Sequence, residues 1–308
     1  MKNFLGLLTA FFTALFISVF VYAADSEPFS STLMESDGVL YSNYSPIGDV
    51  YLPERMADFY VTEDYIYYVY FSENKAEEGI YRCKKDLSDM TLIKNCYADN
   101  VMYCCGIIYY VDHTNDDFDM LCSIDTDTLQ VTKHLTHSNK YSLRLYCINS
   151  DYIYFSVSDK RISKLYRQNI NNPVNKKLLY LSKTNNIYNC IVNDKSIYIE
   201  TSQGITILNK STGMTTGTGA SSIDLIGSID NKIYACDFSA NIYSINEVGT
   251  LQEILTITPE KGHNELYSTN ITGNKIYLSV ANFTNGRANI EELHYIYNPE
   301  TDELQLLN

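Results

Sequence analysis

The sequence predicts an all-β protein, a β-propeller of six four-stranded blades, and three observations lead to that prediction. An Ile-Tyr or similar pair recurs six times along the 308 residues, and successive tyrosines are 42, 45, 44, 36 and 43 residues apart. A second apolar segment follows each pair, and turn residues separate four short strand-like runs in every period. A four-stranded repeat of about 40 to 50 residues is typical of a propeller blade. The six anchor tyrosines are Tyr67, Tyr109, Tyr154, Tyr198, Tyr234 and Tyr277.

Each period is expected to form one radial sheet. A blade is covered by its neighbours on both faces, so its middle strands should be apolar or aromatic at consecutive positions, as in YIYYV at 65–69. A β-sandwich would not keep one period along the whole chain, and no stretch after residue 24 has the apolar spacing of an amphipathic helix. The second recurring segments are 80–83, 121–125, 165–169, 205–209, 242–246 and 293–297.

The number of blades depends on one further hairpin. GVLYSNYSPIGDVYL at 38–52 has the pattern of two strands and a turn, but its Tyr41 lies only 26 residues before Tyr67, which is short for a full blade. Six blades are therefore predicted and seven remain open. In the six-blade arrangement, this hairpin would cap one face or add a strand where the ring closes.

The chain divides into three parts. Residues 1–24 are predicted to be a signal peptide because Lys2 precedes an apolar run, and VYAA at 21–24 offers a small-residue cleavage site. Residues 25–55 form an N-terminal segment with the hairpin, and residues 56–308 form the propeller. The protein is therefore expected to be secreted or held at the cell surface. An uncleaved leader would be its one contact with a membrane.

Composition narrows the class of partner. The formal net charge is −14 and the basic residues do not cluster, which argues against nucleic acid as a ligand. Eight cysteines are present without a C-x-x-C motif, and a body of this size can fold without disulfides. Five of them fall inside strand patterns and are predicted to fill the core as small apolar side chains: Cys83, Cys122, Cys147, Cys190 and Cys236.

No catalytic or cofactor motif is recognisable in the sequence. It has no H-E-x-x-H, no G-x-S-x-G and no phosphate-binding loop, so no catalytic residue and no cofactor is assigned. The five histidines are scattered and are interpreted as exposed loop residues. Calcium is the one ion considered, because DHTNDDFD at 112–119 offers hard oxygen ligands, although it lacks the spacing of an EF-hand. Its candidate ligands are Asp112, Asn115, Asp116, Asp117 and Asp119, and a solvated acidic loop is the alternative.

A second loop is a candidate contact surface. NFTNGRAN at 282–289 is the corresponding loop of the last period and contains an Asn-Gly turn. Propellers place variable binding groups on loops that a rigid ring holds in position. The candidate residues are His263, Asn282, Asn285 and Arg287, with Lys261 beside them.

The repeat resembles a known family. KIYACDFSANIYSINEVG at 232–249 is similar to the repeat of the YWTD propellers of low-density-lipoprotein receptors, and the resemblance places Asp237 and Asp112 at that family's structural aspartate. The other four anchors have Tyr70, Val157, Thr201 or Val280 there, and tryptophan is absent. Residues 38 to 308 resemble more closely the exported, tyrosine-rich bacterial propellers of unknown function. The resemblance implies a fold and leaves function open.

Three functions follow as hypotheses. The first is a non-catalytic propeller that binds an extracellular protein, peptide or cell-surface glycan through a loop face or the channel mouth. The second is a glycan-processing enzyme, a lyase or hydrolase, with its site in the channel. The third is a structural scaffold of the cell envelope.

Overall fold

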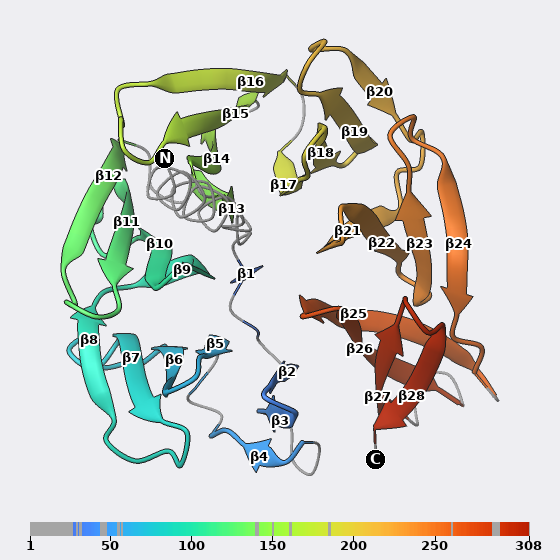
Figure 1. Ribbon diagram of the computed structural model, residues 1–308, viewed down its shortest axis with the longest axis horizontal. Helices are drawn as coiled ribbons and strands as arrows, with labels where there is room; N and C mark the ends of the chain where they lie inside the picture. Colours follow the sequence, from blue (N-terminus) through green and yellow to red (C-terminus); the bar gives the residue numbers. More distant parts are fainter. Residues whose placement is uncertain are drawn as a thin grey trace, which may run out of the picture.

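The computed structural model is a ring of seven sheets that follow one another in chain order (Figure 1). The structure describes residues 27–28, 30, 33–43, 48–53, 56, 58–138, 142–149, 151–159, 162–183, 186–259, 261–284 and 290–307. The predicted signal peptide lies outside these ranges. Within them, no helix is long and apolar enough to cross a bilayer.

Six of the seven sheets contain four consecutive antiparallel strands, and each sheet is one blade. Blade 1 comprises β2 (Leu33–Ser36), β3 (Val39–Ser42) and β4 (Val50–Tyr51). Blade 2 comprises β5 (Asp58–Val61), β6 (Tyr65–Tyr70), β7 (Gly79–Lys84) and β8 (Thr91–Asn95). Blade 3 comprises β9 (Ala98–Cys104), β10 (Ile107–Asp112), β11 (Asp119–Asp125) and β12 (Val131–His137), and β1 (Glu27–Pro28) pairs with β9.

The remaining blades repeat this plan. Blade 4 comprises β13 (Leu143–Ile148), β14 (Tyr152–Asp159), β15 (Ile162–Asn169) and β16 (Lys176–Ser182). Blade 5 comprises β17 (Ile187–Val192), β18 (Ser196–Thr201), β19 (Gly204–Asn209) and β20 (Thr215–Gly217). Blade 6 comprises β21 (Ile223–Ile229), β22 (Lys232–Asp237), β23 (Asn241–Ile245) and β24 (Leu251–Thr256). Blade 7 comprises β25 (His263–Thr272), β26 (Lys275–Phe283), β27 (Ile290–Asn298) and β28 (Glu303–Leu307).

The all-β propeller is confirmed, but the prediction of six blades is wrong. The hairpin at 38–52 belongs to a seventh blade, so the ring takes in residues that the sequence placed in the N-terminal segment. Tyr41 pairs with Met34 and packs with Leu52 and Phe59 against blade 2. The short spacing misled the prediction because β4 has two residues and pairs parallel to β3, so this blade needs less chain than the others.

The core lies between the blades. All six anchor tyrosines are at most 3% exposed, and one apolar cluster after another joins the strands of adjacent blades. The five strand cysteines are buried, as predicted. None of the eight cysteines is joined to another by a disulfide in the structure. The seam between two blades is therefore the unit that the repeated Ile-Tyr pair stabilises by apolar burial.

The four strands of blade 7 are consecutive in the chain. The ring closes through side-chain contacts between blade 7 and blade 1. Asn270 Nδ2 donates to the carbonyl oxygen of Leu33 at 2.8 Å, and Glu35 Oε2 lies 2.7 Å from Lys275 Nζ. The Tyr277 hydroxyl also donates to Glu35, at 3.0 Å. This junction is a polar contact between blade faces.

Each blade presents two different ends. The antiparallel pairing of the first two strands puts the start of the innermost strand beside the end of the second, as Ala98 beside Asp112 and His263 beside Phe283. We call this end of the ring the loop face, because the loops between second and third strands lie there. The opposite end, which carries the tight turns after the innermost strands, is the turn face. Figure 1 shows the fourth strands of the blades along the rim and the first strands around the centre.

Candidate binding site at the channel mouth

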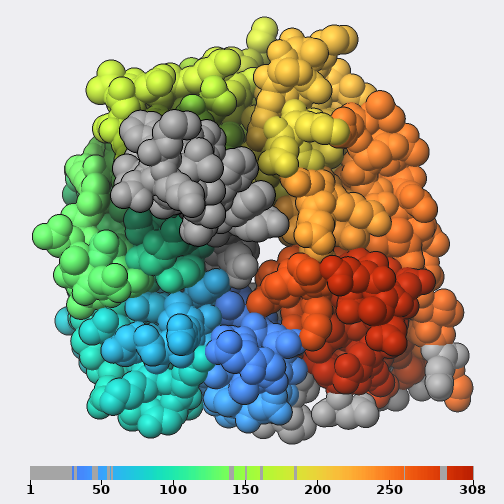
Figure 2. Space-filling model, viewed as in Figure 1, coloured from blue at the N-terminus to red at the C-terminus, as the bar shows by residue number. Residues whose placement is uncertain are grey.

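Three charged residues lie at the starts of innermost strands in three consecutive blades. Asp58 is the first residue of β5, while Asp99 and Arg144 are the second residues of β9 and β13. β9 and β13 are the innermost of the four consecutive strands in their blades, and β1 pairs with the inner edge of β9 at Met102 and Tyr103. Asp99 and Arg144 are exposed at the opposite ends of these strands, at the loop face. Figure 2 shows a narrow opening near the centre of the ring. We call Asp58, Asp99, His113, Asp119 and Arg144 the mouth cluster.

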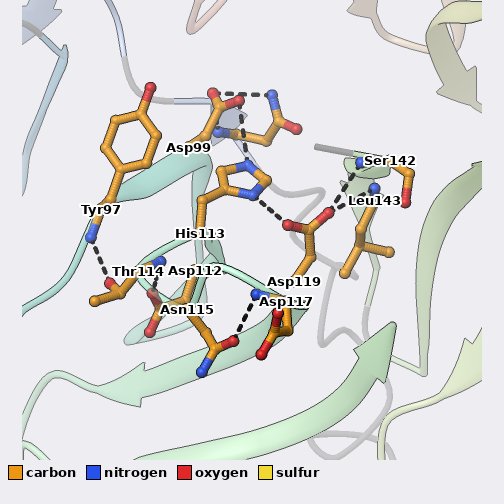
Figure 3. A network of polar contacts seen from close by, with 11 residues as sticks. Tyr97, Asp99, Asp112, His113, Thr114, Asn115, Asp117, Asp119, Ser142 and Leu143 are labelled. Atoms are coloured by element: carbon orange, nitrogen blue, oxygen red, sulfur yellow. Dashed lines mark hydrogen bonds and ion pairs between the residues drawn. The ribbon is translucent and has the colours of Figure 1, made fainter. Parts of the chain in front are cut away.

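Asp99 is positioned by a buried histidine and a second aspartate (Figure 3). His113 Nδ1 lies 2.7 Å from Asp119 Oδ1, and His113 Nε2 lies 3.7 Å from Asp99 Oδ2, an ion-pair distance. The other oxygen of Asp119 accepts the backbone N–H groups of Ser142 and Leu143, at 2.9 and 3.1 Å. His113 is 3% exposed and Asp119 fully buried, so this array joins blade 3 to blade 4.

A β-bulge shapes the backbone at Asp99. The pairing of β9 with β10 slips between the partners of Tyr109 and Val111, and Asn100 has a positive φ of 50°. The Asn100 N–H donates to Asp99 Oδ1 at 2.7 Å. Bulges of this kind re-aim a side chain beside a site, and here the bulge begins directly after Asp99.

The charges of the cluster shift one another's protonation. The interaction with His113 lowers the pKa of Asp99 against the effect of burial, and Arg144 lowers it further. Burial raises the pKa of Asp58 to about 6, and the negative charge of Asp99 adds to that rise. Burial lowers the pKa of His113, but the carboxylates of Asp99 and Asp119 outweigh it and the net pKa is raised. The mouth thus holds two different carboxyl groups: Asp99 is ionised and exposed, whereas Asp58 retains its proton to a higher pH.

The residues proposed as calcium ligands lie in and beside the loop between β10 and β11, but several of their oxygens accept protein hydrogen bonds. Asp112 accepts the N–H of Thr114 at 2.9 Å, and Asn115 accepts that of Asp117 at 2.8 Å. Asp119 points to blade 4, as described above, while Asp116 is exposed. Among the residues the structure describes, no group of three His, Cys, Asp or Glu side chains has the arrangement of a metal site. The calcium site and its alternative, a solvated acidic loop, both stay predictions.

The second predicted surface is on the same loop face in blade 7. The ring of His263 stacks on Phe283 at 5.0 Å, and its Nε2 lies 3.2 Å from Glu265. Asn282 is buried and donates to Asn264 Oδ1 at 2.8 Å, so it supports the loop from below. Lys261 is exposed. Asn285 and Arg287 lie outside the described residues.

Most of the mouth cluster is not apparent from the sequence. The interpretation of the histidines as exposed is wrong for His113 and His294, which are 3% and 2% exposed. No motif marks Asp58, Asp99 or Arg144, because each stands alone in its own period. The signal available in the sequence was positional, since each of the three lies nine or ten residues before the anchor tyrosine of its period. The resemblance did identify Asp237 as a structural residue: it accepts the N–H groups of Ser239 and Asn241 and organises the next loop.

A separate hollow of about 500 Å³ lies at the turn face between blades 5 and 6. Its lining includes Asn193, Asn231, Lys232 and Glu247. Asn193 accepts the N–H groups of Lys195 and Ser196 and donates to the Asn231 carbonyl oxygen, so it holds turns together. Its exposed carboxylate, Glu247, lies 2.8 Å from Lys195 Nζ, so a surface lysine already pairs with that charge.

Comparison with known proteins places the chain among β-propellers. No family model and no curated protein matches it, but several solved structures are similar to it. Puromycin hydrolase has a TM-score of 0.58 and 10% identity over 79% of this chain and 43% of that chain. A YWTD-type propeller in the nidogen/laminin complex has a TM-score of 0.52 and 11% identity, over 77% of this chain and 94% of that chain.

A third similar structure is the β-propeller domain of the Trilobed protease from Pyrococcus furiosus, which reveals an open velcro topology. Its TM-score is 0.55 at 14% identity, and 81% of each chain is covered. The chain spans less than half the length of the puromycin hydrolase it matches. At these identities the likeness shows the fold alone.

Proposed function

We propose that this protein is an exported, non-catalytic propeller that binds an extracellular partner at the channel mouth, and that the partner is a peptide or protein segment with a basic side chain. One observation carries the proposal: Asp99 is ionised and exposed on an innermost strand, and the buried His113 and Asp119 fix its position. A carboxylate held in this way binds a cation without first losing rotamer freedom.

Two further observations support a peptide. Arg144 beside Asp99 offers a cationic contact for a carboxylate or a backbone carbonyl group of the same ligand. Several structural neighbours are peptidases, in which a propeller of this kind is one part of a longer chain.

The test is a binding titration with a fluorescent peptide panel that varies only in Lys, Arg, Gln and Glu at one position. Peptides with Lys or Arg should bind more tightly than those with Gln. Asp99→Asn should weaken the basic peptides at least about tenfold, since a charge-assisted contact contributes about 1.5–3 kcal/mol. Binding of the Gln peptide should change little.

The matched control is Asp127→Asn. Asp127 is exposed in the same blade, but lies in the turn after β11 at the turn face. The proposal fails if both variants bind alike, or if the panel shows no preference for positive charge. N-terminal sequencing of the protein from culture medium tests export separately.

A glycan-processing enzyme is the second candidate, and one observation favours it. The pKa values of Asp58 and Asp99 are pushed apart, which is how paired carboxyl groups divide the roles of acid and base. Turnover of a glycan panel that is lost in Asp58→Asn, with a pH optimum between the two pKa values, would establish this activity. No turnover at any pH leaves the binding role.

A further inference from the structure

Two adjacent cysteines occupy the hairpin turn between β9 and β10 at the turn face. Cys104 ends β9 and is buried, while Cys105 is exposed in the turn itself. Their sulfur atoms are 3.7 Å apart. This distance is within reach of a bond of about 2.05 Å once the side chains rotate.

The backbone does not account for a cysteine at this position. Cys104 pairs with Ile107, so Cys105 and Gly106 are the two central residues of the turn, with φ values of 51° and 79°. Both angles are positive, which defines a type I′ turn that favours Asn or Asp followed by Gly. Two other tight turns of the ring have Asp at the first central position, in Asp37-Gly38 and Asp230-Asn231. Cys105 therefore has a left-handed conformation that its side chain disfavours.

Other cysteines of the ring are buried, and their thiols have raised pKa values. Burial raises the pKa of Cys122 to about 11 and that of Cys236 to about 12. Burial also raises the pKa of Cys96 and Cys190. These thiols stay protonated and shielded, as in a structural core. Cys105 alone of the eight is exposed, and it has a second thiol beside it.

We propose that Cys104 and Cys105 form a reversible vicinal dithiol site that exchanges with low-molecular-weight disulfides. The deprotonated sulfur of Cys105 attacks one sulfur of the disulfide RSSR, and the first thiolate RS⁻ leaves. Cys104 then loses its proton and attacks the Cys105 sulfur, which releases the second RS⁻. The two protein thiols lose two electrons, RSSR gains them, and the two protons end on the released thiols.

The resulting disulfide is labile. Adjacent α-carbons are about 3.8 Å apart, closer than the 4.4–6.8 Å usual for a disulfide, so the ring is strained. Strained, exposed disulfides are reduced more readily than structural ones. Closing the ring must also distort a turn whose Gly106 carbonyl oxygen accepts both the N–H and the hydroxyl of Thr126, at 2.9 and 2.7 Å. The site is thus a reversible exchange site and adds no stability to the fold.

The test treats the folded full chain with glutathione disulfide, blocks remaining thiols with an alkylating reagent and maps the peptides by mass spectrometry. The peptide with residues 104 and 105 should lose two hydrogens, remain unalkylated at both sulfurs and resist fragmentation between them. Phenylarsine oxide, which captures paired thiols, should bind the reduced protein one to one and be released by a dithiol. Cys105→Ser should abolish both results.

Cys83→Ser is the matched control, because it removes a cysteine from the core of another blade and should leave both results unchanged. Cys104→Ala should stop at the mixed disulfide on Cys105. The proposal is overturned if the native protein also stops at that mixed disulfide, if Cys105 pairs with another cysteine, or if phenylarsine oxide binding survives in Cys105→Ser.

Discussion

The seam between blades 3 and 4 and the seam between blades 5 and 6 are both bridged by a carboxylate, but the surroundings of the two carboxylates differ. Asp119 accepts two backbone N–H groups of blade 4 and faces His113. Glu200 in β18 accepts the N–H of Leu225 in β21 at 2.8 Å. No histidine accompanies it in the described contacts, and burial raises its pKa to about 7, with Asp224 adding to the rise.

A carboxylate that bridges two blades can therefore make the stability of the seam depend on pH in two different ways. At the first seam the buried negative charge of Asp119 is compensated by a histidine whose own pKa is raised. At the second seam the fold favours the protonated carboxyl, so the seam weakens as that proton leaves. Substitutions at the two seams test this contrast.

The largest effect is expected for Asp119→Ala. The change removes, from a buried seam, the oxygens that face His113 Nδ1 and accept the N–H groups of Ser142 and Leu143, which should cost about 3 kcal/mol or more in the free energy of unfolding. Urea titration at neutral pH measures it, with an unchanged m-value as the sign of an intact native state. Asp117→Ala, an exposed neighbour in the same loop, should cost less than about 0.5 kcal/mol. Equal losses of unfolding free energy in the two variants would show that Asp119 does not bridge the blades.

Glu200→Gln tests the second seam, with an effect on the order of 1 kcal/mol that depends on pH. A folded pKa raised to about 7 means that stability is lost as pH rises from the unfolded value near 4.3 toward 7. Gln keeps the oxygen that accepts the Leu225 N–H and carries no charge. The variant should therefore be at least as stable as the native protein at pH 8 and should lose the pH slope. A native slope retained in the variant would contradict this assignment.

The contrast between the seams also marks what local sequence can predict. The Ile-Tyr anchors and the four strands per blade follow from apolar pattern and turn residues, because each is set within one period. Asp119 and Glu200 act on backbone in the next blade, and the sequence pattern of one period does not show which oxygen will meet which N–H group. DHTNDDFD accordingly suggested a calcium loop, although Asp119 is the first residue of a strand and is fully buried.

The mouth cluster is harder still to predict for the same reason. Asp58, Asp99 and Arg144 each stand in a separate repeat and meet only because three innermost strands begin at one end of the ring. Six blades were preferred to seven through a related assumption, that every blade needs an equal length of chain. Repeats reveal the fold readily, whereas the positions at which they differ carry the candidate function.

His113→Gln sharpens the comparison at the first seam, with an expected loss of up to about 1 kcal/mol at pH 6. The folded pKa of His113 is raised, so its contribution is present in full below the unfolded value near 6.5 and is lost as pH rises through the folded value. The loss should therefore shrink by pH 8.5 in urea titrations.

His294 is the matched control with the opposite sign. It is buried beside Ser279 Oγ at 2.9 Å, and burial lowers its pKa. Its contribution is present above the unfolded value and is lost as pH falls, so His294→Gln should be most damaging at high pH. Parallel pH profiles for the two variants would show that the carboxylates do not control His113.

The smallest effect is expected from calcium, which asks whether a metal ion belongs to the first seam at all. Calcium takes six to eight oxygen ligands, but Asp112, Asn115 and Asp119 already direct oxygens to protein N–H groups. We therefore expect the melting temperature to be the same with calcium and with a chelator. Saturable stabilisation by calcium that magnesium does not reproduce, and that Asp116→Asn with Asp117→Asn removes, would reverse that expectation, since an ion that binds only the folded state must raise its stability.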